Sequence, residues 1–206
     1  MTRKISLLLL LITLLAGGVA RADDASRTIL DRAAAAFNGS KSIKATFSTD
    51  IDGSTTTGTI TIQGDKFHIS SKEYSTWYDG KTQWSYSSAS NEVNITEPTP
   101  EELTEINPFV IISSLRKSYN STKMKSPAGF SKVMLTPKSS AHSDIKKAEI
   151  VFNDKTYMPS QVILEMSAGS RINIVIKSIA KGNILPASTF IFNKKSLPGA
   201  EVIDLR

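Results

Sequence analysis

Apolar and polar residues alternate through most of the chain beyond residue 40. Ile43, Ala45 and Phe47 share one parity, and Ile60 and Ile62 share another after an intervening turn. A period of two residues is typical of a β-strand with one apolar face. Roughly ten or eleven such segments, joined by short turns, predict a mainly β (α+β) fold: a strongly curved, incomplete antiparallel β-barrel.

The most aromatic part of this pattern is centred on Asp79-Gly80, a dipeptide that supplies the positive φ angles of a tight hairpin. Beyond the turn, Trp84 and Tyr86 alternate with polar residues, and Val93 and Ile95 do so in the next segment. The pattern therefore predicts three adjacent strands. An ordinary half-buried meander is one interpretation, and the wall of a ligand cavity is the other.

Two segments have helical rather than strand periodicity. Residues 23–37 carry an apolar stripe at helical spacing and predict an N-terminal helix. Thr99-Pro100-Glu101-Glu102 combines an N-cap threonine, a proline at the first helical position and a glutamate three residues past the cap. Asn107-Pro108 repeats the start signal, so we expect a short helical lid made of two helices, at 100–106 and from 108 to about 119.

The first 22 residues have the features of a cleaved secretory signal peptide. The basic pair Arg3-Lys4 precedes an apolar run from Ile5 to Leu15, and Ala20-Arg21-Ala22 offers a cleavage site with small residues. The apolar run is shorter than the roughly 20 residues that a membrane span requires. We therefore expect an exported protein in which residues 23–206 form a single domain.

Composition excludes several classes of protein. The chain has no cysteine, so neither a disulfide nor thiol chemistry is available. Of 25 lysines and arginines, Arg3, Lys4 and Arg21 fall in the signal segment, which leaves 22 against 19 acidic residues, a net charge of +3. The remaining lysines are scattered along the chain. They do not cluster as they would on a nucleic-acid-binding face, and we expect no nucleic-acid partner.

Residues suited to catalysis are scarce. The two histidines, His68 and His142, are the side chains that could act as bases at neutral pH. The chain contains no G-x-S-x-G elbow, no paired metal ligands and no glycine-rich phosphate loop. The sequence therefore predicts that the protein is not an enzyme, with no catalytic residue, metal or cofactor.

The order and spacing of these motifs resemble those of the periplasmic lipoprotein carrier proteins of the LolA type. The matching segments are the run from Trp77 to Tyr86, Asn91-Glu92-Val93, Asn107-Pro108-Phe109, Leu135-Thr136-Pro137-Lys138, Phe190-Ile191-Phe192 and Pro198-Gly199-Ala200-Glu201-Val202. The resemblance covers the chain from residue 23 to its end, and the Phe190 to Phe192 segment is expected to form a last strand.

The resemblance implies a monomeric periplasmic carrier that holds the acyl chains of lipoproteins in an apolar cavity. It would take them from an ATP-driven exporter in the inner membrane to an outer-membrane acceptor whose identity the sequence does not reveal. The expected cavity residues are Phe47, Ile62, Phe67, Ile69, Trp84, Tyr86, Val93 and Ile95. The expected lid residues are Leu103, Ile106, Phe109 and Ile112.

Two positions qualify the resemblance. Phe67 matches a cavity-mouth phenylalanine of the family, which predicts that Phe67→Glu would abolish lipoprotein binding and leave the fold largely intact. Better-studied members also carry an arginine that latches the lid, and the corresponding position here is Gln63, with Lys66 as the nearest basic residue. Control of the lid by an arginine is therefore not expected.

Two alternative functions stay open at this point. A carrier or sensor of another lipid could use the same fold, since an apolar hollow does not by itself specify its ligand. A hydrolase is the weaker alternative, because no set of catalytic residues supports it.

Overall fold

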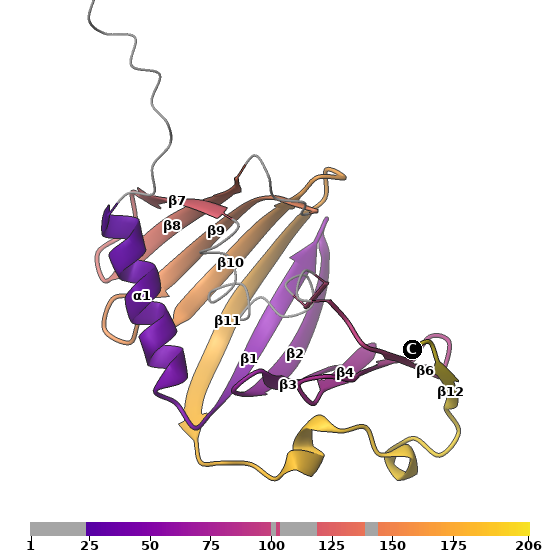
Figure 1. Ribbon diagram of the computed structural model, residues 1–206. Coiled ribbons are helices and arrows are strands. Elements are labelled where there is room, and N and C mark those ends of the chain that lie inside the picture. The colour runs from indigo at the N-terminus through magenta and orange to yellow at the C-terminus, as the bar shows by residue number, and fades with distance from the viewer. Residues whose placement is uncertain (1–23, 100–101, 104–118, 139–143) are drawn as a thin grey trace, which may run out of the picture.

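The computed structural model describes residues 24–99, 102–103, 119–138 and 144–206 (Figure 1). The elements are α1 (Asp24–Asn38), β1 (Ser42–Ile51), β2 (Ser54–Gln63), β3 (Lys66–Ser71), β4 (Tyr74–Tyr78), β5 (Gln83–Ser87), β6 (Glu92–Thr96), β7 (Tyr119–Met124), β8 (Phe130–Pro137), β9 (Ile145–Asn153), β10 (Pro159–Met166), β11 (Arg171–Gly182), the 3-10 helices η1 (Ala187–Phe190) and η2 (Lys194–Ser196), and β12 (Glu201–Asp204).

All of these strands belong to one 12-stranded sheet in the order β12-β6-β5-β4-β3-β2-β1-β11-β10-β9-β8-β7. The sheet consists of two antiparallel meanders, β1–β6 and β7–β11, joined by the pairing of β1 with β11. It curls without closing, because the edge strands β7 and β12 do not pair with each other (Figure 1). The predicted strongly curved, incomplete barrel is confirmed, and every strand pair in it is antiparallel except that of β6 with β12.

Two local predictions about strands are wrong. The second lid helix was expected to run to about residue 119 with no strand directly after it, but residues 119–124 form the edge strand β7. The Phe190 to Phe192 segment is not a strand, since η1 ends at Phe190 and no strand follows until β12. β12 then pairs with β6 in parallel, which brings the sheet to more strands than the alternation alone predicted.

The N-terminal helix is confirmed to within one residue at each end. Ile29, Leu30 and Ala33 are buried against the sheet. The Ser26 hydroxyl lies 2.8 Å from the Ser121 hydroxyl of β7, so the two groups share a buried hydrogen bond. This helix lies across the concave side of the sheet (Figure 1), and the side that it faces is called the inner face below.

In the broad half of the sheet (β7–β11), the inner face is mainly apolar from β8 to β11. Directly opposite residues of antiparallel strands point to the same face. Val133, Ile150, Val162 and Ile174 are successive cross-strand partners from β8 to β11. All four are buried in the same core cluster as Leu30 and Ala33 of α1. On the opposite, outer face, the same strands carry residues such as Lys132, Glu149 and Gln161.

The segment after β11 crosses the outer face of the other, narrow half of the sheet, which consists of β1–β6 (Figure 1). We call residues 183–200 the C-terminal strap. Its η1 lies against β3, and its Phe192 ring packs 5.5 Å from the Trp77 ring of β4. Phe190 is fully buried, yet it lies outside the main core cluster. The protein therefore has a second, smaller core between the strap and the sheet.

Only the start of the predicted lid is described. Thr99 and Glu102 form the predicted capping box, with the Thr99 amide donating to the Glu102 carboxylate at 2.8 Å and the Glu102 amide donating to the Thr99 hydroxyl at 3.3 Å. Leu103 packs against the main core. The lid residues Ile106, Phe109 and Ile112 lie outside the described residues. Within the described ranges, no helix has the length and apolar character needed to cross a membrane.

Candidate functional site

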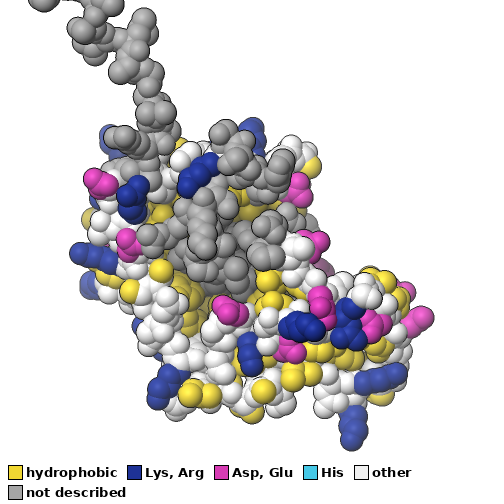
Figure 2. All heavy atoms as spheres, in the orientation of Figure 1, with side chains coloured by type: hydrophobic (Ala, Val, Ile, Leu, Met, Phe, Trp, Pro, Cys, Tyr) yellow, Lys and Arg dark blue, Asp and Glu magenta, His cyan; other side chains and the backbone are white. Residues whose placement is uncertain are grey.

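The candidate site is the inner face of the narrow half of the sheet, where the side chains change from apolar to polar. Figure 2 shows basic and acidic side chains interspersed over the visible surface of the molecule. One row of successive cross-strand partners from β1 to β6 is Ile43, Ile62, Phe67, Tyr78, Gln83 and Thr96. The adjacent row is Ala45, Ile60, Ile69, Thr76, Ser85 and Asn94. Each row is apolar over β1–β3 and polar over β5–β6, so this face is amphipathic across the strands.

Four of the predicted cavity residues lie together on this face. Phe47, Ile62, Phe67 and Ile69 are all buried and belong to the main core cluster. Phe67 is 0 % exposed, and its ring centroid lies 5.3 Å from that of Tyr78 on the next strand. Phe67 is therefore packed within the core rather than placed at an open cavity mouth.

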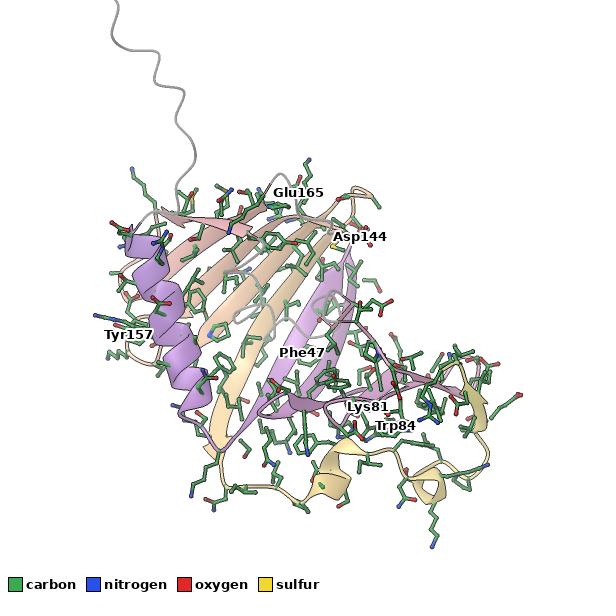
Figure 3. All side chains as sticks on the ribbon, in the orientation of Figure 1. Phe47, Lys81, Trp84, Asp144, Tyr157 and Glu165 are labelled. Carbon is green, nitrogen blue, oxygen red and sulfur yellow. The ribbon has the colours of Figure 1, made fainter. Side chains whose placement is uncertain are left out.

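The position of the Phe47 ring depends on a glycine of the neighbouring strand β2. Gly58 is its cross-strand partner, and a Cβ built on Gly58 would lie 2.7 Å from the Phe47 ring and 2.8 Å from the backbone oxygen of Ser70. Both distances are shorter than real contacts. The absence of a side chain at Gly58 thus lets the Phe47 ring lie over β2 on the inner face (Figure 3).

The other four predicted cavity residues lie on the opposite face of the sheet. Trp84 is the cross-strand partner of Trp77, which is itself the partner of His68, and this row alternates with the inner row. Ile95 is opposite Trp84, and Val93 is opposite Tyr86. Trp84, Tyr86, Val93 and Ile95 therefore do not line one hollow with Phe67. They face the side of the sheet that the strap crosses, and Figure 3 shows Trp84 beside that segment.

The inner face ends in a buried amide that sequence reasoning did not single out. Gln83 is 8 % exposed, and its Nε2 donates to the Ser85 hydroxyl at 3.0 Å. Its Oε1 is buried and has no hydrogen-bond partner in the described part of the chain. Alternation did place Gln83 and Ser85 on one side of β5, and that was the available signal. It could not tell which side of the strand faces the interior.

Gln63, the position that corresponds to the family's lid-latching arginine, holds the strap. Its Oε1 accepts from the Leu185 amide at 2.7 Å, and its Nε2 donates to the Leu185 carbonyl at 3.4 Å. On the outer face, the Gln63 amide thus forms the same pair of hydrogen bonds with the Leu185 backbone that a residue of a neighbouring strand would form. In this protein the position links the sheet to the C-terminal strap.

A half-buried histidine lies beneath the strap on the same outer face. The His68 ring stacks on Trp77 with a centroid distance of 4.9 Å and an interplanar angle of 13°. Its Nε2 is buried and has no hydrogen-bond partner in the described ranges. Burial lowers the pKa of His68 below its ordinary value, because the cationic form loses hydration without gaining a carboxylate partner.

The pKa of His68 leads to an expected pH dependence of stability. The unfolded chain takes up this proton near pH 6.5 and the folded protein only at lower pH, so stability is full above about 6.5 and falls as the pH is lowered through that window. Glu149 and Asp204 have lowered pKa values, that of Asp204 to about 2, and their contributions are lost at more acidic pH.

We expect His68→Phe, which keeps the stacking on Trp77, to flatten the loss of thermal stability between pH 7 and 5. The comparison is best made in a His142→Gln background, so that His68 is the titrating histidine. An unchanged slope in the His68→Phe protein would contradict the assignment.

Two surface pockets flank α1. One, of about 310 Å³, is lined by Arg27, Leu30, Tyr119, Asn120, Ser121, Leu135 and Lys138. The other, of about 350 Å³, is lined by Ala25, Thr28, Ile29, Arg32, Lys123, Ser131, Asp154 and Tyr157. Both have several charged or polar side chains at their walls, unlike the apolar rows of β1–β3. Among the described residues, no group of three or more acidic or histidine side chains could hold a metal ion.

These features define a class of protein: an open, curled sheet with an apolar inner face, of the kind that holds a ligand. Comparison with protein families agrees, since the model described as the outer membrane lipoprotein carrier protein LolA matches residues 15–169. The chain belongs to this family, whose members are carrier or binding proteins. No curated protein matches the chain.

Solved structures share the fold at low sequence identity. An uncharacterised conserved protein of Thermus thermophilus has a TM-score of 0.60 and 13 % identity, over 87 % of this chain and 99 % of that one. A domain assigned to an outer membrane lipoprotein-sorting protein of Vibrio parahaemolyticus has a TM-score of 0.50 and 12 % identity, over 84 % and 98 % of the two chains. At these identities the similarity supports the fold alone.

Proposed function

We propose that the protein is a periplasmic carrier that binds the acyl chains of lipoproteins and shuttles them from the inner to the outer membrane. The observation that carries the proposal is the continuous apolar inner face of an open sheet, from β8 to β3, in a chain of the lipoprotein-carrier family. The signal-like N-terminal sequence supports export.

The physical need for such a carrier follows from the hydrophobic effect. Burial of one methylene contributes about 0.8 kcal/mol, so a 16-carbon chain exposed to water costs on the order of 12 kcal/mol. A triacylated polypeptide would not leave a membrane unaided on a useful timescale. A half-open sheet can cover acyl chains and still release them, because it does not enclose them completely.

The partners follow from this role. The protein would act as a monomer between an ATP-driven lipoprotein exporter in the inner membrane and an acceptor at the outer membrane. No catalytic group is needed for the transfer. A carrier or sensor of another lipid remains the competing function, and the identity of a co-purified ligand separates the two.

We expect a palmitoyl probe with a photoactivatable diazirine on its chain to label the inner face in a saturable manner. Labelling should map to residues such as Ile69 and Phe47, and should spare the adjacent outer-face His68. Tandem mass spectrometry of the labelled peptides gives the positions, and native mass spectrometry of protein purified from its own cell envelope should show a bound triacylated polypeptide. Labelling confined to the strap side, around Trp77 and Phe192, would overturn the assignment of the site.

A further inference from the structure

The buried amide of Gln83 is placed where the apolar inner face becomes polar. Its row partner Tyr78 is buried beside Phe67, and its other partner, Thr96, is half-buried on β6. Because Nε2 is engaged by the Ser85 hydroxyl at 3.0 Å, the amide group is fixed in orientation and Oε1 is turned away from Ser85. A buried acceptor without a partner is unfavourable in the free protein, and it requires an explanation.

The Gln83 amide has an unsatisfied atom whichever end carries the oxygen. If the two ends were exchanged, the serine hydroxyl would donate to the amide oxygen and the amide nitrogen would be left without a partner. In either orientation one hydrogen-bonding atom of Gln83 is unsatisfied, at 8 % exposure of the residue. The site therefore provides one directed hydrogen bond to a group that is not part of the described chain.

The surroundings of Gln83 are polar but carry little charge. The inner-face residues of β4–β6 in these rows are Thr76, Tyr78, Gln83, Ser85, Asn94 and Thr96. The nearby cation Lys81 lies in the β4–β5 turn, 77 % exposed, and is paired with Glu97 at 3.3 Å. Arg206, which also lies near Glu97, is paired with Asp204. Both of these cations therefore already have a carboxylate partner. An anionic head group would lose hydration here without gaining a charged partner.

We propose that Gln83, with Ser85 and Thr76, forms a subsite for an uncharged polar head group that carries an amide N–H or a hydroxyl, attached to acyl chains lying over β1–β3. The inference rests on the proposed acyl-binding function and adds to it a preference among acylated molecules. An N-acylated polypeptide terminus offers an amide, and an acylglycerol offers a hydroxyl. Phosphate-headed lipids are disfavoured.

The test measures displacement of a fluorescent palmitoyl probe by four competitors with one 16-carbon chain each: N-methyl palmitamide, monopalmitin, methyl palmitate and hexadecyl phosphate. Wild-type protein should bind the amide or the hydroxyl compound roughly five- to tenfold more tightly than the methyl ester, the factor expected for one neutral hydrogen bond. Hexadecyl phosphate should bind more weakly than the ester. The relative affinities of the first two identify the group that Gln83 prefers.

Gln83→Leu should remove the preference while leaving the affinity for methyl palmitate unchanged. Its melting temperature should not fall, because an unsatisfied buried amide is replaced by an apolar side chain of similar size. Gln161→Leu is the matched control on the outer face of β10, where the glutamine donates to Asn173 at 2.8 Å, and it should retain the wild-type preference.

Two results would overturn the subsite while the acyl-binding function stands: equal binding of amide, hydroxyl and ester by the wild type, or a preference that persists in Gln83→Leu. If Gln83→Leu does not fold, Ser85→Ala is the variant to use, because it releases the Gln83 amide with little change in volume. This variant should show a reduced preference, and an undiminished preference would also overturn the subsite. Absence of binding of methyl palmitate and of the probe to the wild type refutes the proposed function itself.

Discussion

Phe67→Glu is expected to prevent stable folding at neutral pH. Phe67 is 0 % exposed and lies between Ile62 and Tyr78 in the inner row. Loss of a packed phenylalanine costs about 3–5 kcal/mol. An unpaired carboxylate in an apolar site costs several kcal/mol more. Together these terms are comparable to the whole stability of a typical domain, about 5–15 kcal/mol.

Circular dichroism and thermal melting measure this effect directly, with two controls. Thr57→Glu places the same charge on the exposed outer side of β2 and should melt close to the wild type. Phe67→Leu removes the ring but not the apolar character, and it should fold with reduced stability. If Phe67→Glu melted like the wild type, Phe67 would face a hydrated hollow, as the resemblance to the family had suggested from sequence.

Local signals in the sequence predicted much of the fold. The α1 helix and the Thr99–Glu102 capping box are both confirmed. They could be predicted because each depends on contacts between residues only a few positions apart. Strand parity correctly grouped Phe67 with Ile69, and Trp84 with Tyr86. The prediction failed when residues from different strands were combined into one cavity. Parity shows which residues share a face of one strand, but it does not show which face of the next strand points to the same interior.

The division of the candidate site depends on the C-terminal strap. On β5, the apolar Trp84 and Tyr86 face outward, on the side of the sheet where Phe192, about a hundred residues later, packs against Trp77 of the neighbouring strand. A barrel with one interior would require the apolar side of every strand to point inward, and that assumption made Trp84 a cavity residue. Since the covering segment is distant in sequence and irregular in structure, periodicity could not reveal it.

Gln63 is a second position whose contacts could not be predicted from the sequence. Alignment to the family's arginine identified the position but not the direction of its side chain. Ile62 and Phe67 are partners on the inner face, so the neighbouring pair Gln63 and Lys66 must face outward. Parity alone could therefore have placed Gln63 on the outer side. Only the structure shows that its amide holds the Leu185 backbone there.

The strap is expected to be part of the cooperative fold, and Phe190→Ala tests this. Phe190 is 0 % exposed and belongs to η1, which lies against β3. Removing the ring should lower the free energy of unfolding by about 3–5 kcal/mol, as for other buried phenylalanines. Ile191, its neighbour in the chain, is an exposed large hydrophobic residue, so Ile191→Ala should change stability by less than about 0.5 kcal/mol.

Denaturant unfolding followed by tryptophan emission gives two readouts in one experiment. Both tryptophans of the chain, Trp77 and Trp84, lie on the outer face beneath the strap, and Trp77 contacts Phe192. In Phe190→Ala the emission should shift to longer wavelength at a lower denaturant concentration than in the wild type, in a single transition, whereas Ile191→Ala should unfold at the wild-type midpoint with wild-type emission. A Phe190→Ala protein with wild-type stability and emission would mean that the strap contributes nothing to the fold, and that the outer-face aromatic residues need another reason for their burial.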